Sequence, residues 1–508
     1  MWPFRLRTHW SGVLDMTGQN ERTPGVDLSM RTLATLDPRV AIPGYDRSAL
    51  GGGIVHIGVG GFHRAHQAVY LDELCRQGLT DWSITGAGVL VGDAAMATAL
   101  QLQDHLYTLV TRDARATNVR VIGSIVDYVL ASPSIDPLVA RLAQPETRIV
   151  SLTITEGGYP VDEATGAFLP PPKDGLPPAF EALARALRAR RDAGLGGFTV
   201  LSCDNIMGNG DTARTATLGV CAMVEPGLEE WVGQNVAFPN GMVDRITPQT
   251  ADADREFLAT EYGLIDRWPV VAETFIQWVI EDDFPYGRPP YQDAGVLLTD
   301  DVRPYETLKL RILNAGHSTT TYMAALVGHV YIHEIMADPL LATYMQRFHD
   351  DEATPSLPAV PGIDVEDYKQ VVRERFANPA VRDQVARVCL DGTSKFPKFL
   401  VPTIESQLDK GGQVRLSALA LACWCQYLLG KDDQGRDIVL SADPRLEQAR
   451  PFAQASQSDA GAFLGFGEVF GQRLASDPVF RPAFVAALTS VREVGVHRTL
   501  ERWLSEAT

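Results

Sequence analysis

Three polar residues within one predicted helix could together take a proton from a hydroxyl group. Lys309, Asn314 and His317 supply an amine, an amide and an imidazole. A partly buried lysine beside other positive charge can lose its proton near neutral pH and act as a general base. An amide NH₂ group can then stabilise the alkoxide, as donors in an oxyanion hole do. These residue types predict proton transfer at an alcohol.

The spacing places the three residues around one end of an α-helix. Asn314 and His317 are three apart and share a face. At about 3.6 residues per turn, Lys309 lies about 140° around the axis from Asn314 and about 80° from His317. Gly316 is expected to open space beside them. The alternative is structural, with a surface lysine, a helix-bending asparagine and a hydrogen-bonded core histidine.

A glycine-rich loop between a predicted strand and a predicted helix is typical of dinucleotide binding. Gly58, Gly60 and Gly61 follow an apolar β-branched run. Such glycines let the backbone approach a pyrophosphate at a helix N-terminus. Phe62 and Arg64 lie in the same loop and are predicted to contact the cofactor. His63 occupies the place of the usual third glycine, so a tight turn without a ligand is the alternative.

An acid after the second strand would bind the adenosine ribose hydroxyls and disfavour a 2′-phosphate. Asp93 is the nearest acid downstream of the predicted strand end at Gly86–Val89. It therefore predicts NAD rather than NADP as the cofactor. The same aspartate could instead be the N-cap of a helix over 94–102.

Two more polar clusters end apolar runs. Asn205 follows a predicted strand and would emerge at the carboxyl edge of a parallel sheet, where ligands bind. Asp204 beside it could cap a helix. Asp244 and Arg245 lie in a compact segment and could form a structural ion pair.

Metal-assisted activation of an alcohol is the other chemical route. It needs Cys, His or Glu ligands around an open tetrahedral site. His63 and His66 are three apart, but they lie in the glycine-rich loop and no spaced thiolates accompany them. We therefore expect metal-independent chemistry.

The elements that must position these residues change character along the chain. Apolar runs over 54–57, 82–90, 148–154 and 198–202 alternate with helical patterns, including 67–77 and 180–193, which predicts a parallel α/β sheet. Beyond about residue 300, long helical patterns replace the strands. We expect an α/β fold with three parts: a flexible extension over 1–28, a Rossmann-type dinucleotide-binding domain over 29–300, and a mostly α-helical domain over 301–508.

Composition narrows the partners and the compartment. Lys and Arg total 45 against 63 Asp and Glu, a net charge of −18, which disfavours nucleic-acid binding. Six cysteines form no disulfide pattern. The apolar stretch Leu416–Leu429 is too short to span a membrane, and residues 1–18 lack the apolar core of a signal peptide. We expect a cytoplasmic protein that binds a small molecule, with neither a membrane nor a nucleic acid as partner.

Several long motifs in order resemble the mannitol dehydrogenase family of polyol-specific long-chain dehydrogenases and reductases. The resemblance runs from about Ile54 to the C-terminus. The motifs are IGVGGFHRAHQAVY (57–70), SLTITEGGY (151–159), SCDN (202–205), FPNGMVDRITP (238–248), the Lys309/Asn314/His317 spacing, and DGTSKFPKF (391–399).

The resemblance implies a cleft between the two domains, NAD as cofactor, and roles for individual residues. Lys309 would be the general base, Asn205 and Asn314 would stabilise the alkoxide, and His317 would orient the substrate. Asp244, Arg387 and Lys395 would recognise other hydroxyls, and Glu306 would pass the proton to solvent. Asp93 matches the NAD-selecting acid, but Gly92 replaces a second acid common there, which leaves room for NADP.

The implied reaction is the interconversion of a sugar alcohol, best matched by D-mannitol, with its 2-ketose. A hexuronate reductase acting on fructuronate or tagaturonate would share the base and amides but need a cation for its carboxylate. A preference for arabinitol or sorbitol is also open. An NAD(H)-binding sensor is a further alternative, against which the complete Lys309/Asn314/His317 set argues. The resemblance also implies a monomer.

Overall fold

The first β-branched run of the sequence forms the central strand of a five-stranded parallel sheet in the computed structural model, which describes residues 25–114, 116–162, 165–172 and 175–505. The strand order is β6-β3-β2-β7-β8. These strands are β2 (Ile54–Ile57), β3 (Ile84–Gly88), β6 (Ile125–Leu130), β7 (Ile149–Leu152) and β8 (Thr199–Ser202). Because the chain moves outward from β2 on one side and returns to β7 on the other, the loops after β2 and β7 meet at the switch point where α/β sheets bind ligands.

Both faces of this sheet are covered, so its strands are apolar on both sides. Along β2, Ile54 belongs to one core cluster, while Val55 and Ile57 belong to another on the opposite face. This burial explains the continuous apolar runs in the sequence. The helices of this domain are α1 (Gly61–Ala65), α2 (Gln67–Arg76), α3 (Ala94–Leu102), α4 (Asp136–Leu142), α5 (Pro178–Asp192), α6 (Asn209–Val224), α7 (Leu228–Asn235) and α8 (Asp252–Tyr262).

Two smaller sheets flank the parallel sheet and were not predicted. One has the order β11-β4-β5 and the other β13-β12-β9, and each includes an antiparallel pair. Their strands are β4 (Tyr107–Arg112), β5 (Thr117–Ile122), β9 (Gly241–Asp244), β11 (Val270–Glu273), β12 (Gln277–Glu281) and β13 (Leu297–Thr299). Strand β9 ends on Asp244 and strand β11 ends on Glu273, and both acids contact the helical domain.

The N-terminal extension was predicted to cover residues 1–28, but the last of these residues are part of the fold. Val26 and Asp27 form β1, which pairs with β10 (Leu264–Ile265), and Leu28 is 1% exposed. Residues 26–28 therefore belong to the folded domain. Residues 1–24 lie outside the described part of the chain.

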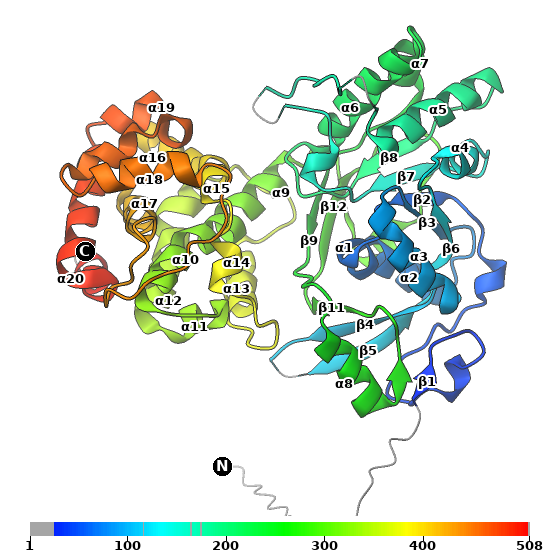
Figure 1. Cartoon of the computed structure of the whole chain (residues 1–508), viewed down its shortest axis with the longest axis horizontal. Helices are drawn as coiled ribbons and strands as arrows, with labels where there is room; N and C mark the ends of the chain where they lie inside the picture. Colours follow the sequence, from blue (N-terminus) through cyan, green and yellow to red (C-terminus); the bar gives the residue numbers. More distant parts are fainter. Residues whose placement is uncertain (1–24, 115, 163–164, 173–174, 506–508) are drawn as a thin grey trace, which may run out of the picture.

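The second domain is helical and begins at Arg303, directly after the last strand (Figure 1). The central helix is α17 (Arg415–Tyr427), which is buried along nearly its whole length between α10 and α20. The other helices are α9 (Arg303–Leu308), α10 (Ala315–Val327), α11 (Ile332–Ala337), α12 (Pro339–Arg347), α13 (Val365–Phe376), α14 (Val385–Val388), α15 (Gly392–Phe399), α16 (Val401–Lys410), α18 (Leu446–Ala455), α19 (Gly467–Ser476) and α20 (Phe480–Ser505).

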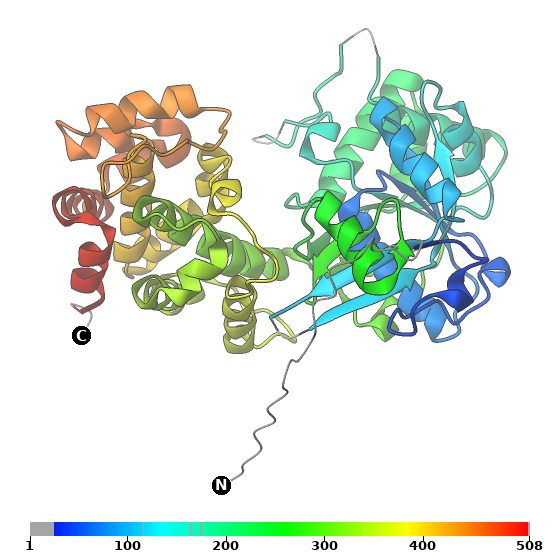
Figure 2. The same ribbon diagram turned by 60° about the horizontal axis from the view of Figure 1, so that its bottom comes forward.

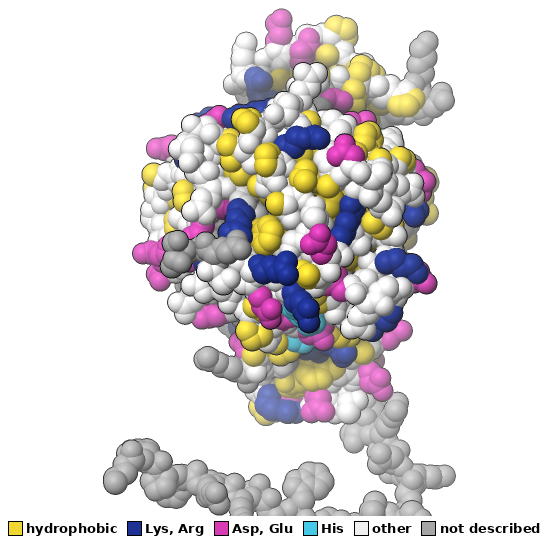
Figure 3. Space-filling model, turned by 90° about the vertical axis from the view of Figure 1, so that its left-hand side faces the viewer, with side chains coloured by type: hydrophobic (Ala, Val, Ile, Leu, Met, Phe, Trp, Pro, Cys, Tyr) yellow, Lys and Arg dark blue, Asp and Glu magenta, His cyan; other side chains and the backbone are white. Residues whose placement is uncertain are grey.

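The two domains lie side by side, with α9 and the strands β9 and β12 at the junction in the view of Figure 1, and Figure 2 shows the same separation from another direction. The face of the helical domain turned away from the sheets carries Lys and Arg interspersed with Asp and Glu (Figure 3). Among the described residues, no helix combines the length and the hydrophobicity needed to cross a bilayer.

Candidate active site

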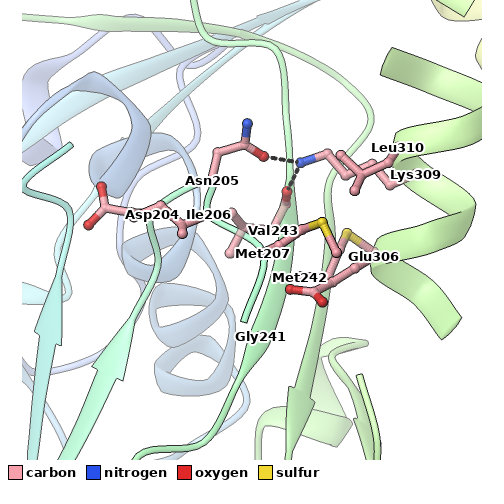
Figure 4. A pocket seen from close by; sticks show the side chains of 10 residues that line it. All are labelled: Asp204, Asn205, Ile206, Met207, Gly241, Met242, Val243, Glu306, Lys309 and Leu310. Carbon is pink, nitrogen blue, oxygen red and sulfur yellow. Dashed lines mark hydrogen bonds between the residues drawn. The ribbon is translucent and has the colours of Figure 1, made fainter. Parts of the chain in front are cut away.

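Lys309 projects from the helical domain into the junction with the sheet domain (Figure 4). Its Nζ donates to Asn205 Oδ1 at 2.7 Å and to the carbonyl oxygen of Val243 at 2.7 Å. The residue is 8% exposed, and burial lowers the pKa of its amine. Both hydrogen-bond partners are neutral, so neither holds the proton on the amine as a carboxylate would. The structure thus excludes the surface-lysine interpretation.

The turn that carries Lys309 is a π-helix, η6 (Lys309–Asn314), inserted between α9 and α10. The amide of Ala315 reaches back five residues to the carbonyl of Leu310. This wider turn brings residues five apart close to the same side. The separation of about 140° between Lys309 and Asn314, predicted for a regular α-helix, is therefore wrong. Single-turn π-helices are found frequently at functional sites.

The back of this turn is braced by a second π-helical segment, η7 (Phe348–Ala353). The Nε2 of His349 lies 2.9 Å from the carbonyl oxygen of Ile312, and burial lowers the pKa of His349 to about 4. A neutral ring must then carry its proton on Nε2 to donate this bond. A Cβ on Gly316 would lie 2.9 Å from the same nitrogen. The space predicted beside Gly316 is therefore filled by His349.

Asn205 and Glu306 line one cavity together with Lys309. Asn205 follows β8, as predicted, and its amide oxygen faces Lys309, which leaves the NH₂ group directed away from the amine (Figure 4). Glu306 accepts from the amide of Gly208 at 3.0 Å. Burial raises the pKa of Glu306 to about 7. The cavity therefore contains an amine and a carboxyl group that both exchange protons more readily near neutral pH than their exposed counterparts.

Asp204 does not cap a helix, contrary to the structural alternative. It accepts from the amides of Ile154 and Thr155 at 3.1 and 2.9 Å and from the Tyr159 hydroxyl at 2.7 Å. The aspartate thereby ties the loop after β7 to the end of β8. Asn205, the next residue, is positioned from this anchored point.

His317 lines a second cavity together with Arg375 and Asp383. Its ring stacks on Phe376 with 3.8 Å between centroids and 8° between planes. Burial lowers the pKa of His317 to about 3, so the ring is neutral, and its Nε2 has no hydrogen-bond partner among the described residues. Asn314 Oδ1 is likewise buried without a partner there. Unpaired buried polar atoms of this kind are suited to a polar ligand.

Arg375 is the residue that the sequence interpretation missed. From the end of α13, it donates to both oxygens of Asp244 at 2.7 and 2.9 Å and to both oxygens of Glu273 at 2.9 and 2.8 Å. The structural ion pair suggested between Asp244 and Arg245 is therefore wrong, because Asp244 pairs with Arg375 and Arg245 donates to carbonyl oxygens. No spacing rule connects Arg375 with an aspartate 131 residues away.

Arg387 and Lys395 both lie close enough to His317 to influence its pKa. Arg387 pairs with Asp383 at 2.5 Å, and Lys395 donates to the carbonyl oxygen of Val388 at 3.0 Å. Burial lowers the pKa of Lys395. The structure thus gathers both predicted substrate-binding cations on the His317 side of the junction.

The glycine loop fits a dinucleotide pyrophosphate. Gly58 has φ +94°, and a Cβ there would lie 2.1 Å from the carbonyl oxygen of Thr153, so the turn requires glycine. A Cβ on Gly60 would meet only one carbonyl oxygen, at 3.8 Å, and would otherwise fill open space. Gly61 begins α1. A backbone cradle at a helix start, kept open by the missing side chain, is suited to a phosphate group.

The side chain of Arg64 lies beneath this cradle. It is 1% exposed, and its guanidinium donates to the carbonyl oxygens of Gly60 and Trp268. His63 is also buried, and its ring stacks on His56 at 3.4 Å. Phe62 stacks on His66 at 4.8 Å and stays partly exposed. The side chains of His63 and Arg64 thus pack inward and support the loop from below.

Asp93 lies directly over the end of β3. A Cβ on Gly88 would come within 2.4 Å of the Cβ of Asp93 and 2.5 Å of the Tyr128 hydroxyl. One carboxylate oxygen accepts from the amide of Leu90 at 2.9 Å, and the side chain makes no N-cap bond to α3. The position at the second strand's carboxyl end is the one expected of a ribose-binding acid. Within the described residues, no group of three or more His, Cys, Asp or Glu side chains has a metal-binding arrangement.

Comparison with known proteins identifies the family. Residues 52–293 match the profile described as the mannitol dehydrogenase Rossmann domain, and residues 301–492 match the mannitol dehydrogenase C-terminal domain. Mannitol 2-dehydrogenase from Cereibacter sphaeroides is 43% identical over 476 residues, which cover 92% of this chain and 99% of the relative. The enzyme of the same name from Aspergillus fumigatus is 40% identical over 482 residues, 92% of this chain and 96% of the relative.

Two solved structures share the whole architecture. The ternary complex of Pseudomonas fluorescens mannitol 2-dehydrogenase with NAD and D-mannitol has a TM-score of 0.83 at 44% identity, covering 95% of this chain and all of the other. A substrate-free D-sorbitol dehydrogenase has a TM-score of 0.87 at 35% identity, with 93% and 100% coverage. Both domains and their order are thus common to these proteins, and the chain belongs to the mannitol dehydrogenase family.

Proposed function

We propose that this protein is an NAD-dependent polyol dehydrogenase that oxidises D-mannitol to D-fructose and catalyses the reverse reduction. The observation that carries this proposal is the buried Lys309 amine at the junction of two domains, in a chain 44% identical to a mannitol 2-dehydrogenase solved with NAD and D-mannitol. The relatives named mannitol 2-dehydrogenase cover almost the whole chain, so the proposal concerns the whole protein.

Lys309 acts as the general base in this proposal. The neutral amine has two N–H bonds, and its two acceptors, Asn205 Oδ1 and the Val243 carbonyl, use both. The lone pair then remains for the proton of the substrate hydroxyl. Burial makes the neutral form accessible because it lowers the pKa of the amine.

Asn205 and Asn314 stabilise the alkoxide from two sides. Lysine holds the amide oxygen of Asn205, so the NH₂ group is oriented for the substrate oxygen. Asn314 lies on the same π-helical turn as Lys309 and completes the pair. Oriented amide donors lower the energy of developing negative charge without reorganising during the reaction.

Glu306 passes the proton onward from Lys309. It lines the same cavity, and the pKa of about 7 that burial gives it lets the carboxyl group gain and lose a proton near neutrality. Gly58, Gly60 and Gly61 would hold the pyrophosphate of NAD, and Asp93 would bind its ribose. Bound there, NAD would supply the hydride acceptor for the carbon that bears the reacting hydroxyl. The carboxylate at the second strand favours NAD over NADP.

His317 orients the substrate through its unpaired Nε2, with Arg387 and Lys395 recognising further hydroxyl groups. Asp244 is proposed to recognise a further hydroxyl, since each of its oxygens accepts one bond from Arg375 and keeps a lone pair for another donor. A hexuronate reductase is the second candidate, since Arg387 and Lys395 are cations. The pairing of Arg387 with Asp383 weighs against a substrate carboxylate at that position.

A substrate comparison tests the proposal. NADH oxidation is measured with fructose, fructuronate and xylulose side by side, and fructose is expected to have the highest kcat/KM. Mannitol, sorbitol and arabinitol are compared in the opposite direction with NAD. A clear preference for fructuronate would replace the proposed function by the hexuronate reaction, and no turnover with any substrate would favour a sensor.

We also infer a cytoplasmic, monomeric enzyme. The six cysteines are all buried and free, which supports a reducing compartment. Cell fractionation and light scattering of the purified protein test the two statements separately.

A further inference from the structure

We propose that Arg375 is a positioning residue that clamps the helical domain to the sheet domain, and thereby sets both substrate affinity and the pH dependence of catalysis. The inference rests on the proposed function and deepens it. It adds a residue that touches neither the reacting atoms nor the cofactor loop, but connects the two cavities of the active site.

The clamp is a buried triad drawn from both domains. Arg375 lies at the end of α13, while Asp244 ends β9 and Glu273 ends β11. The side chains are 5%, 6% and 3% exposed, in the order arginine, aspartate and glutamate. Bidentate bonding to both carboxylates, as described above, defines the position of the guanidinium in two directions. Phe275 adds a cation–π contact, with 4.1 Å from the guanidinium carbon to the ring centroid.

The burial makes this contact costly to break. Although burial opposes charge on Asp244, Arg375 holds the pKa of that carboxyl below its ordinary value. Burial raises the pKa of Glu273 despite the same partner. Removing the arginine would leave two carboxylates in one buried site, which destabilises the closed junction much more than loss of an exposed pair would.

The triad is connected to a functional element on each side. In the helical domain, the residue after Arg375 is Phe376, whose ring supports His317. In the sheet domain, Arg245 donates to the carbonyl oxygen of Glu273 and, at 2.5 Å, to that of Ala65 at the end of α1. The chain of contacts therefore runs from the substrate histidine to the helix that follows the cofactor loop.

The triad also faces the proposed base. The charged and titratable groups around Lys309 are Asp244, Arg375 and Glu306, with His66 and Asp204 on the adjoining elements. Burial holds the pKa of His66 at about 3, so it is neutral. Burial is the largest cause of the lowered pKa of Lys309, Asp244 opposes it, and Arg375 reinforces it. The arginine thus offsets an aspartate that would otherwise keep the amine protonated.

Arg375→Met is the direct test. We expect KM for mannitol and fructose to rise about 10-fold or more, because the two walls of the site are no longer held together. We also expect the acid limb of the kcat/KM profile for mannitol oxidation to move up by about one pH unit. The acid limb moves to higher pH because the variant lacks a cation near Lys309, and the pKa of the amine therefore rises. We expect Glu273, whose pKa burial already raises, to take up a proton before Asp244, so that the carboxylate acting on Lys309 keeps its charge.

Three further variants distinguish the role of Arg375 in holding the two domains together from its effect as a positive charge near Lys309. Arg375→Lys keeps the cation but cannot bond both carboxylates bidentately, so KM should rise while the pH profile stays in place. Glu273→Gln removes the carboxylate that is not among the charges acting on Lys309 and should have the same outcome. Arg373→Met removes a different arginine from the same helix and should leave both quantities unchanged. Together these variants keep the test valid if Arg375→Met fails to fold.

Hydrogen exchange supplies a measurement that does not depend on turnover. Amides of β9 and β11 should exchange faster in Arg375→Met than in Arg373→Met. If exchange, KM and the pH profile of Arg375→Met all match those of Arg373→Met, the proposal is wrong. If the wild-type protein turns over no polyol or ketose, the proposed function fails, whereas the exchange result still tests the clamp.

Discussion

The two cavities on either side of the Asp244–Arg375 pair differ in what surrounds their polar side chains. Around Lys309 the hydrogen-bond acceptors are a neutral amide and a backbone carbonyl. Around His317, two cations, Arg375 and Arg387, are each paired with carboxylates. A buried amine among neutral acceptors can change its charge, whereas paired cations keep theirs. The comparison teaches that one side of the junction is suited to moving a proton and the other to recognising hydroxyl groups.

Lys309→Ala should produce the largest effect and should confine it to the chemical step. We expect kcat to fall by about 100-fold or more, because general-base catalysis contributes on that order. NADH binding, measured by fluorescence titration, should stay as in the wild type. A variant with near-normal turnover across the pH range would show that Lys309 is not the base.

Gly316→Ala should affect both cavities, because the π-helical turn carries Lys309 and Asn314 and leads into His317. The added methyl group would be 2.9 Å from His349 Nε2, so the turn or the histidine must shift. A misplacement of about 1 Å can cost about 100-fold, and we expect kcat to fall by tens of fold. Overpacking should also reduce stability by about 1–3 kcal/mol. Ala315→Gly, on the same turn, is the control variant for the change in stability. An unchanged kcat in Gly316→Ala would show that the geometry of this turn does not affect catalysis.

His317→Ala should alter recognition more than chemistry. The neutral ring has a free Nε2 and a stacking partner, so its loss should raise KM for mannitol about 10-fold and lower kcat less. Its pKa of about 3 means that the ring does not titrate in the working range. The acid limb of the pH profile should therefore stay where it is. A shifted acid limb would mean that proton transfer and substrate recognition are not separated between the two cavities.

Asp93→Ala should act outside both cavities and have the smallest effect. The carboxylate lies at the end of β3, where it would repel a 2′-phosphate. We expect kcat/KM with NADPH to improve several-fold while KM for mannitol stays the same. An unchanged ratio of NADPH to NADH use would assign Asp93 a structural role through its bond to Leu90.

Much of the fold and part of the site could be predicted because they depend on patterns among neighbouring residues in the sequence. The apolar runs around Ile54 and Val150 predict buried parallel strands, and both lie in the central sheet. The turn itself requires the glycine at position 58. The small flanking sheets were missed because their strands pair in mixed directions, in part with partners far away in the chain. The π-helix was missed because a regular α-helix was assumed for a stretch whose hydrogen bonds are five residues apart.

The sequence by itself determined which residues could react, in what order the two domains follow, and where the cofactor loop lies. These properties depend on side-chain chemistry, hydrophobic period and glycine positions, all of which act over a few neighbouring residues. Only the tertiary structure decided that Arg64 turns inward, that His349 fills the space beside Gly316, and that Arg375 rather than Arg245 pairs with Asp244. Such pairings join residues far apart in the chain, and burial alone makes their charges matter.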